Sequence, residues 1–156
     1  MADARDMTHA KPFQTSARQG HPVRGRTLGL SGASTTKMLQ RIEKGFSYQA
    51  VVRLHKASGL PVGSIAQLVR IPQRTLMRRK AQGRLRPEES ERLLRVSGVF
   101  EKALDLFEGN ADRARQWLTT PSKELENQSP LHLARTEVGA REVEDLIGRL
   151  EHGVFT

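Results

Sequence analysis

The side chains best able to do chemistry in this 156-residue chain lie in one short basic stretch. It holds six polar residues that can donate hydrogen bonds: Gln73, Arg74, Thr75, Arg78, Arg79 and Lys80. Arginine can bond two acceptors on guanine, glutamine can pair similarly with adenine, and threonine or lysine can hold a phosphate. We therefore expect an exposed helix here that contacts DNA.

The elements around this stretch have the pattern of a helix-turn-helix. A short helix is predicted from about Pro61 to Val69, and a second from about Gln73 to Gln82, ended by Gly83. The expected buried positions are apolar, namely Ile65, Val69, Ile71 and Leu76. Arg70 occupies the position of the usual turn glycine, so we expect a turn built differently. A solvated basic helix face is the alternative, but the place of the run on the second helix favours DNA.

Charge divides the chain into two halves of opposite sign. Residues 1–87 hold 17 Lys and Arg against 3 Asp and Glu, a net charge of +14. Residues 88–156 hold 9 against 14, a net charge of −5. An anionic partner such as nucleic acid suits the first half, and a protein partner suits the second.

Periodicity predicts an all-α protein in three parts. Residues 1–34 have no apolar period, so we expect a disordered basic tail. Helices from Thr35 and Tyr48 complete a helix-turn-helix domain over 35–87. The remaining helices, expected at 88–107, 111–118, 130–135 and 139–152, form a small helical domain over 88–156. The long helix at 88–107 would either join the two domains into one core or form a dimer seam.

Several function classes lack the residues that they need. The five histidines are scattered without metal-ligand spacing, and no phosphate-binding loop is present. Glu142 and Asp145 lie on an expected solvated face, where paired acids are ordinary. We therefore expect neither an enzyme nor a cofactor or metal. The absence of cysteine, of an apolar secretory signal and of a membrane-length apolar run favours the cytoplasm.

An ordered set of short motifs resembles a known family. The first motifs are Arg74–Lys80, Gly83–Leu85 and Glu88–Arg95, and the later ones are Ala114–Leu118, Pro121, Ser129–Leu133, Thr136–Gly139, Val143 and Arg149–Phe155. Together they resemble the Xre-type antitoxins that are paired with RES-domain toxins. The later motifs are similar to the Xre/MbcA/ParS toxin-binding domain. The resemblance covers about Thr35 to Thr156, and the ordered combination is more specific than any single motif.

The resemblance implies a function for each half. The C-terminal domain would bind and neutralise a RES toxin that degrades NAD, and the N-terminal domain would repress the protein's own operon. The chain ends in an apolar tip, and we expect this tip and two polar neighbours to bind the toxin: Arg149, His152, Val154 and Phe155. We expect Trp117 and Leu118 to be core residues. Glu126-Asn127 replaces the family's usual Gly-Gly turn, which asparagine can tolerate.

The expected partners are the RES toxin, operator DNA and a second copy of the chain. Helix-turn-helix proteins usually read paired half-sites as dimers, so we expect a homodimer within a larger toxin–antitoxin complex. The main rival is a stand-alone transcription regulator whose C-terminal domain dimerises or binds another partner. A toxic RES gene beside this one would favour the antitoxin. A non-specific nucleic-acid binder is disfavoured by the ordered C-terminal half, and competition with random DNA would detect it.

Overall fold

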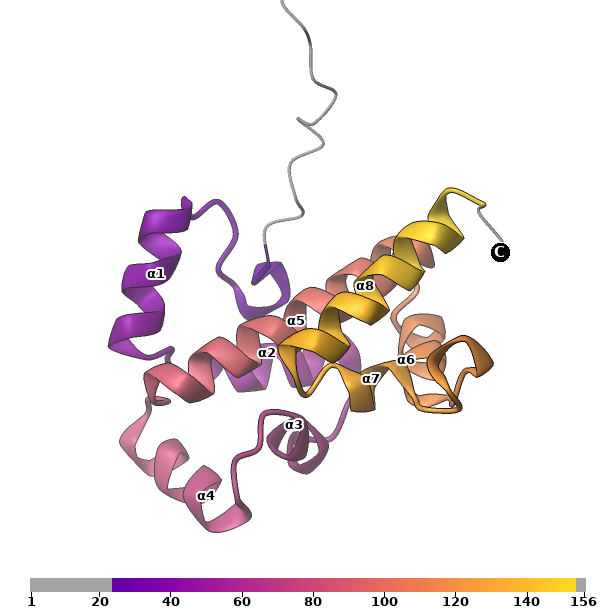
Figure 1. Cartoon of the computed structure of the whole chain (residues 1–156). Helices are drawn as coiled ribbons and strands as arrows, with labels where there is room; N and C mark the ends of the chain where they lie inside the picture. The colour runs from indigo at the N-terminus through magenta and orange to yellow at the C-terminus, as the bar shows by residue number, and fades with distance from the viewer. Residues whose placement is uncertain (1–23, 154–156) are drawn as a thin grey trace, which may run out of the picture.

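The computed structural model describes residues 24–153, and this part of the chain is helical, without β-strands (Figure 1). The elements are η3 (Arg26–Leu28), α1 (Thr35–Lys44), α2 (Gln49–Ser58), α3 (Val62–Leu68), α4 (Gln73–Gln82), α5 (Pro87–Leu106), α6 (Ala111–Thr119), η4 (Lys123–Leu125), α7 (Pro130–Leu133) and α8 (Glu137–Glu151). The all-α prediction is confirmed. The short 3₁₀ helices η3 and η4 were not predicted.

Local sequence chemistry sets most helix ends. Polar side chains cap the N-termini of α1, α6, α7 and α8 by accepting a backbone N–H of the first turn: Ser34, Asn110, Ser129 and Thr136. Gly59 and Gly83 end α2 and α4 with φ angles of 72° and 77°, a left-handed conformation that glycine adopts without strain. These signals explain why the predicted helix bounds lie close to the observed ones.

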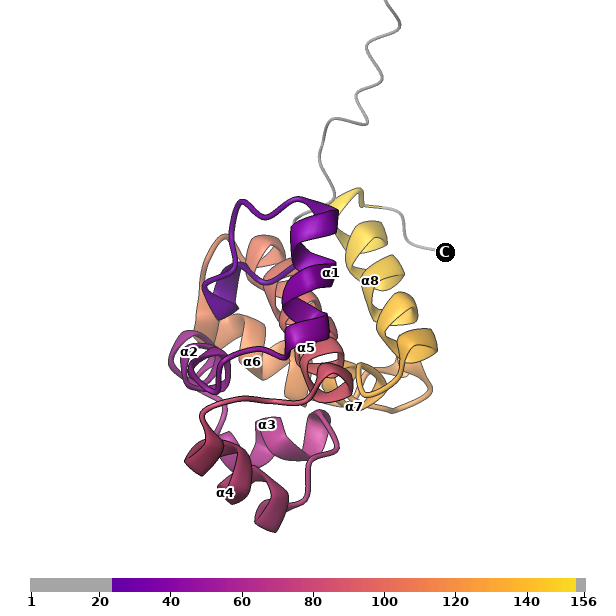
Figure 2. The same ribbon diagram turned by 90° about the vertical axis from the view of Figure 1, so that its left-hand side faces the viewer.

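The long helix α5 is the centre of the molecule. Leu93, Val96, Val99 and Phe100 are at most 1% exposed. The helix packs against η3, α1, α2, α6 and α8, and α8 runs beside it in both views (Figures 1 and 2). Of the two roles considered for α5, joining the halves into one core is therefore the one observed. Its apolar stripe is not available as a dimer seam.

The disordered-tail prediction is wrong for residues 24–34. Leu28 is 1% exposed, and the carboxylate of Glu101 on α5, 2% exposed, holds the segment. This carboxylate accepts the backbone N–H of Gly25 at 3.0 Å, and the N–H and hydroxyl of Thr27 at 2.6 Å each. A segment that is ordered by one buried acceptor needs no apolar period, so periodicity could not reveal it. Residues 1–23 lie outside the described part.

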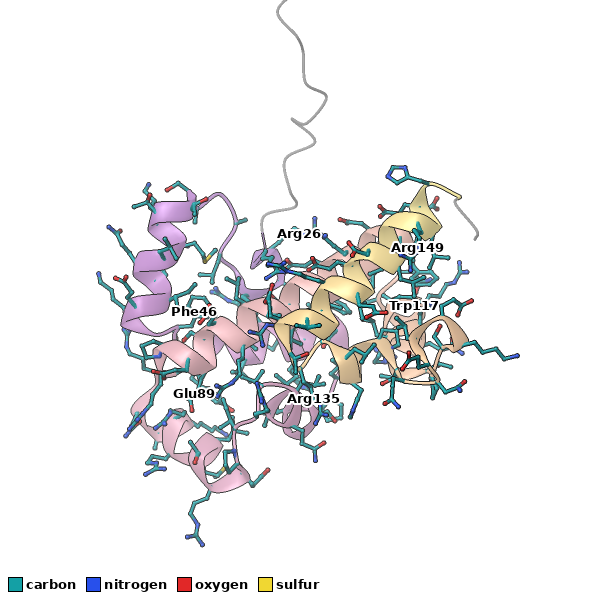
Figure 3. All side chains as sticks on the ribbon, in the orientation of Figure 1. Arg26, Phe46, Glu89, Trp117, Arg135 and Arg149 are labelled. Carbon is teal, nitrogen blue, oxygen red and sulfur yellow. The ribbon has the colours of Figure 1, made fainter. Side chains whose placement is uncertain are left out.

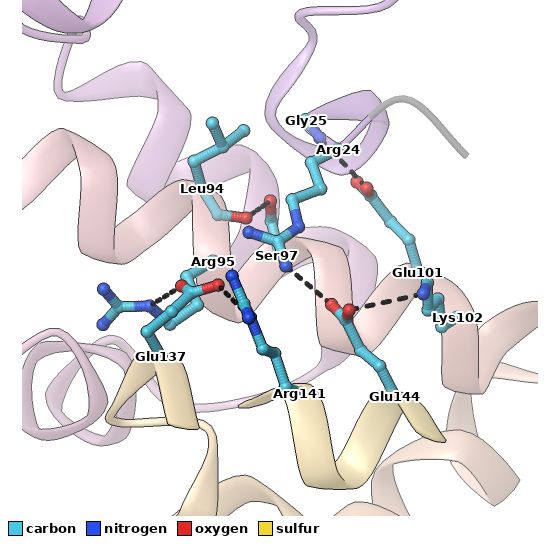
Figure 4. A network of polar contacts seen from close by, with 10 residues as sticks. All are labelled: Arg24, Gly25, Leu94, Arg95, Ser97, Glu101, Lys102, Glu137, Arg141 and Glu144. Carbon is cyan, nitrogen blue, oxygen red and sulfur yellow. Dashed lines mark hydrogen bonds and ion pairs between the residues drawn. The ribbon is translucent and has the colours of Figure 1, made fainter. Parts of the chain in front are cut away.

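Ion pairs also tie the N-terminal segment and α8 to the central helix (Figure 4). Glu144 of α8 accepts from Arg24 at 2.8 Å and from Lys102 of α5 at 3.3 Å. Arg95 of α5 pairs with Glu137 at 3.0 Å. Ion pairs as well as core packing thus hold the N-terminal segment and α8 against α5. Within residues 24–153 no helix is long and apolar enough to cross a membrane.

Candidate functional sites

The first candidate surface is the helix-turn-helix formed by α3 and α4. Both helices lie at one end of the molecule, below the bundle that the other helices form (Figure 2). Their four expected core residues are 1–5% exposed, as predicted: Ile65, Val69, Ile71 and Leu76. Burial of these side chains fixes α4 against α3 and leaves the opposite face of α4 open to solvent.

The turn between α3 and α4 was predicted to differ from the usual glycine turn, but it has the same backbone conformation. Arg70 has a φ of +57°, the left-handed conformation that glycine usually supplies. The Ile71 N–H donates to the Ala66 carbonyl at 2.8 Å, the six-residue bond typical of a helix end that has a left-handed residue. The expectation of another turn was wrong because burying Ile71 outweighs the cost of about 1 kcal/mol for a left-handed arginine.

The open face of α4 carries most of the side chains predicted to contact DNA. Gln73, Arg74, Arg78 and Lys80 are exposed, and Thr75 is half-buried. None of these cations takes part in an ion pair among the residues described. Met77, 58% exposed on the same helix, was not predicted, although its place between exposed cations was a signal. An exposed methionine can contact a thymine methyl group.

Arg79 is the exception, and the prediction that it is exposed was wrong. The residue is 6% exposed, and its Nε donates to Oε1 of Glu89 on α5 at 2.7 Å. The same oxygen accepts the Arg86 backbone N–H at 2.8 Å. Arg79 follows Leu76 by three positions, so it lies on the buried face of α4, and this spacing was the missed signal. The ion pair fixes the end of α4 to the first turn of α5, where Glu89 is labelled in Figure 3.

Glu89 is held in its charged form. Burial alone would raise its pKa, but the hydrogen bonds from Arg79 and the Arg86 N–H, with the charges of Arg79 and Arg92, lower the pKa below its usual 4.5. The carboxylate therefore stays ionised at neutral pH beside the guanidinium. Arg79 is thus suited to positioning α4, whereas its neighbours can contact a ligand.

The second candidate surface lies at the C-terminal end of α8. Arg149 and His152 are exposed there, and Figure 3 shows Arg149 on the same side of the molecule as Trp117. Val154 and Phe155, the other two residues predicted to bind the toxin, lie outside the described residues. The structure therefore brings two of the four predicted residues to one helix end.

An aromatic hollow adjoins this helix end. Phe107 and Trp117 pack with their ring centroids 6.3 Å apart, and the Arg113 guanidinium lies 5.3 Å from the Phe107 centroid. Leu150 of α8 lines the same hollow. Leu118 is fully buried as predicted, but Trp117 is only partly buried. The charged residues Glu108 and Arg113 also line the hollow, so its surface is mixed. The sequence analysis had predicted its tryptophan to be a core residue.

The turn that lacks the family's Gly-Gly pair keeps its left-handed shape. Glu126 and Asn127 have φ angles of 55° and 63°. The Asn127 N–H donates to the Ser122 carbonyl at 2.8 Å, and the Ser122 N–H donates to the Gln128 carbonyl at 3.1 Å. Two non-glycine residues thus accept left-handed strain so that α7 can begin at Pro130.

These features define a class: a helix-turn-helix protein whose DNA-binding domain shares its core with a helical C-terminal domain. Residues 37–98 match the model of the antitoxin Xre-like helix-turn-helix domain, and residues 102–153 match that of the antitoxin Xre/MbcA/ParS C-terminal toxin-binding domain. The two models meet within α5. The division at 87/88 drawn from charge stays a prediction.

Full-length relatives agree with both domain matches. The chain is 44% identical over 132 residues to an antitoxin Xre of Yersinia enterocolitica, covering 84% of this chain and 89% of that protein. It is 33% identical over 139 residues to an antitoxin Xre of Photorhabdus laumondii, covering 88% and 93%. An antitoxin Xre of Pseudomonas putida is 30% identical over 122 residues, covering 78% and 75%. The chain belongs to the Xre antitoxin family. The three relatives named above are antitoxins rather than enzymes.

Proposed function

We propose that this antitoxin neutralises a RES-type toxin, which degrades NAD, through its C-terminal domain, and represses its own operon by placing α4 in the major groove of operator DNA. The observation that carries the proposal is that a DNA-binding surface and a toxin-binding domain share one hydrophobic core. The exposed basic face of α4 suits DNA, and residues 102–153 match a toxin-binding domain. We also propose a cytoplasmic location, because operator DNA lies in the bacterial cytoplasm.

The DNA half of the proposal predicts a steep dependence of affinity on salt. If about six phosphates are contacted, raising salt from about 50 to 200 mM should weaken operator binding on the order of a thousandfold. Arg74→Ala or Arg78→Ala should each cost about 1–3 kcal/mol of binding free energy if the residue reads a base. Lys37→Ala, an exposed cation on α1 away from α4, is the matched control. A flat salt titration would contradict the proposal.

The toxin half predicts a role for the chain end. We propose that Arg149, His152, Val154 and Phe155 contact the toxin, because the two described members are exposed at the end of α8 beside the aromatic hollow. Deleting residues 153–156 should leave the circular dichroism spectrum unchanged and weaken rescue of growth when antitoxin and toxin are co-expressed. Full rescue by the truncated chain would remove the tail from the binding site.

We propose a homodimer as the DNA-binding unit, because helix-turn-helix proteins commonly read paired half-sites. Light scattering of the purified chain, alone and with operator DNA, tests the oligomeric state. The identity of the neighbouring gene distinguishes the antitoxin from its rival, a stand-alone regulator. A neighbour that encodes a RES-type protein, toxic when expressed alone, supports the antitoxin, and a solitary gene supports the regulator.

A further inference from the structure

A groove of about 300 Å³ with mixed polar and apolar walls lies between α3 of the helix-turn-helix and α7 of the C-terminal domain. Its polar lining consists of hydrogen-bond donors and neutral groups: Ser64, Gln67, Thr119, Ser129, His132 and Arg135. The rest of its lining is leucine, and no carboxylate contributes. Figure 3 shows Arg135 on the side of the molecule that carries α3 and α4. Arg135 thus gives the groove a positive charge, although the C-terminal half of the chain is net acidic.

Arg135 is held in place but keeps free donors. Its Nε donates to the His132 carbonyl at 3.1 Å, and its Nη2 lies 3.0 Å from the His132 Nε2. Its own carbonyl accepts from Arg95 at 3.3 Å, which anchors the backbone to α5. A guanidinium has five N–H donors, so the Nη1 pair and one Nη2 hydrogen remain for a ligand. No ion pair among residues 24–153 uses Arg135.

The groove chemistry fits an oxyanion that approaches from the side of α3. A guanidinium can donate to a phosphate in a bidentate fashion, and Ser64, Ser129 and Gln67 can add neutral donors. In helix-turn-helix proteins the first helix of the motif crosses the DNA backbone while the second lies in the major groove. Here that first helix is α3, which supplies Ser64 and Gln67 to the groove. The nearest anion to this wall would therefore be a backbone phosphate.

We propose that this groove binds a phosphate of the DNA backbone while α4 occupies the adjacent major groove. The inference rests on the proposed DNA binding by α4 and deepens it, because it assigns a DNA contact to the domain that matches a toxin-binding family. The contact is independent of base sequence, since phosphates position a protein on DNA without specifying bases. The C-terminal domain thereby stabilises the DNA complex as well as holding the toxin.

The test is Arg135→Gln in the full-length protein. Binding to a fluorescent operator duplex and to a random-sequence duplex is measured by anisotropy at several salt concentrations. The variant should lose about three- to tenfold in affinity for both duplexes, and the log–log salt slope should become shallower by about 1, as expected for one lost phosphate contact. Arg141→Gln, an exposed arginine on α8 that lies in neither candidate surface, should bind both duplexes like the unmodified protein.

A second variant in the same groove keeps the proposal testable if Arg135→Gln fails to fold. Ser64→Asp places a negative charge on the α3 wall of the groove without removing Arg135, and it should weaken DNA binding at least as much. Unchanged affinity and slope in both variants, with binding lost in Arg78→Ala, would overturn the groove proposal alone. Unchanged binding in all three variants would instead contradict the proposed DNA binding by α4. Loss of toxin neutralisation with DNA affinity intact would assign the groove to the toxin and overturn the proposal.

Discussion

Removing Arg79 should cost more stability than removing any exposed cation of α4, because it leaves the buried carboxylate of Glu89 without its partner. The perturbation is Arg79→Met, which keeps the aliphatic stem and removes the guanidinium. Both side chains are nearly inaccessible, at 7% and 8% exposure, so water cannot replace the lost partner. The substitution leaves Glu89 as a buried carboxylate that keeps only its hydrogen bond from the Arg86 N–H.

The expected loss in the free energy of unfolding is about 3–5 kcal/mol, the usual cost of leaving a buried charge without its partner. Domains of this size are stable by about 5–15 kcal/mol, so the variant should remain folded but be much weakened. At an ordinary urea dependence of about 2 kcal/mol per molar, the unfolding midpoint should fall by roughly 2 M.

Urea unfolding followed by circular dichroism measures this shift. Arg78→Met is the matched control, because it removes an exposed arginine one position earlier and should change stability by less than about 0.5 kcal/mol. The double variant Arg79→Met with Glu89→Leu removes both charges and should recover much of the loss. Equal stability of the two single methionine variants would refute the assignment of Arg79 as a buried positioning residue.

The same pair predicts a pH window. Burial raises the pKa of Glu89 in the folded protein, but the hydrogen bonds that it accepts from Arg79 and the Arg86 N–H outweigh burial and lower the pKa. Its contribution is therefore fully present above its usual pKa of 4.5 and is lost as the pH falls through the lower folded value. The stability difference between the unmodified protein and Glu89→Gln should be largest near neutral pH and should shrink in acid. A difference that grows in acid would contradict the sign.

Three further predictions test local structure by urea unfolding and, for Glu101, also by hydrogen exchange. Arg70→Gly should stabilise the protein by about 0.5–1 kcal/mol, because it removes left-handed strain; a loss of stability would contradict this. Gly45→Ala should cost more than Gly83→Ala: both have positive φ, but only at Gly45 would the new methyl collide with a backbone carbonyl, that of Leu85. Equal costs would argue against that close approach. Glu101→Ala should release residues 24–30 and cost about 2–4 kcal/mol; unchanged hydrogen exchange there would contradict it.

The sequence by itself determined the helices, the helix-turn-helix core and the family. Caps, glycine stops and the spacing of apolar residues act over about four residues, so they can be read along the chain. Ile65 and Leu76 were predicted to be buried for this reason, and Gly83 was predicted to end α4. The ordered motifs likewise predicted both matched domains.

Only the tertiary structure decided which carboxylate Arg79 meets and how residues 24–34 fold. The spacing from Leu76 indicates that Arg79, unlike Arg78, lies on the buried face of α4, but its partner Glu89 lies ten positions away on α5. Glu101 reaches Thr27 across 74 positions. The groove at Arg135 likewise depends on the fold, which places residues of α3 and α7 around one hollow. Such partners are brought together by the folding of the core, and no local spacing encodes them.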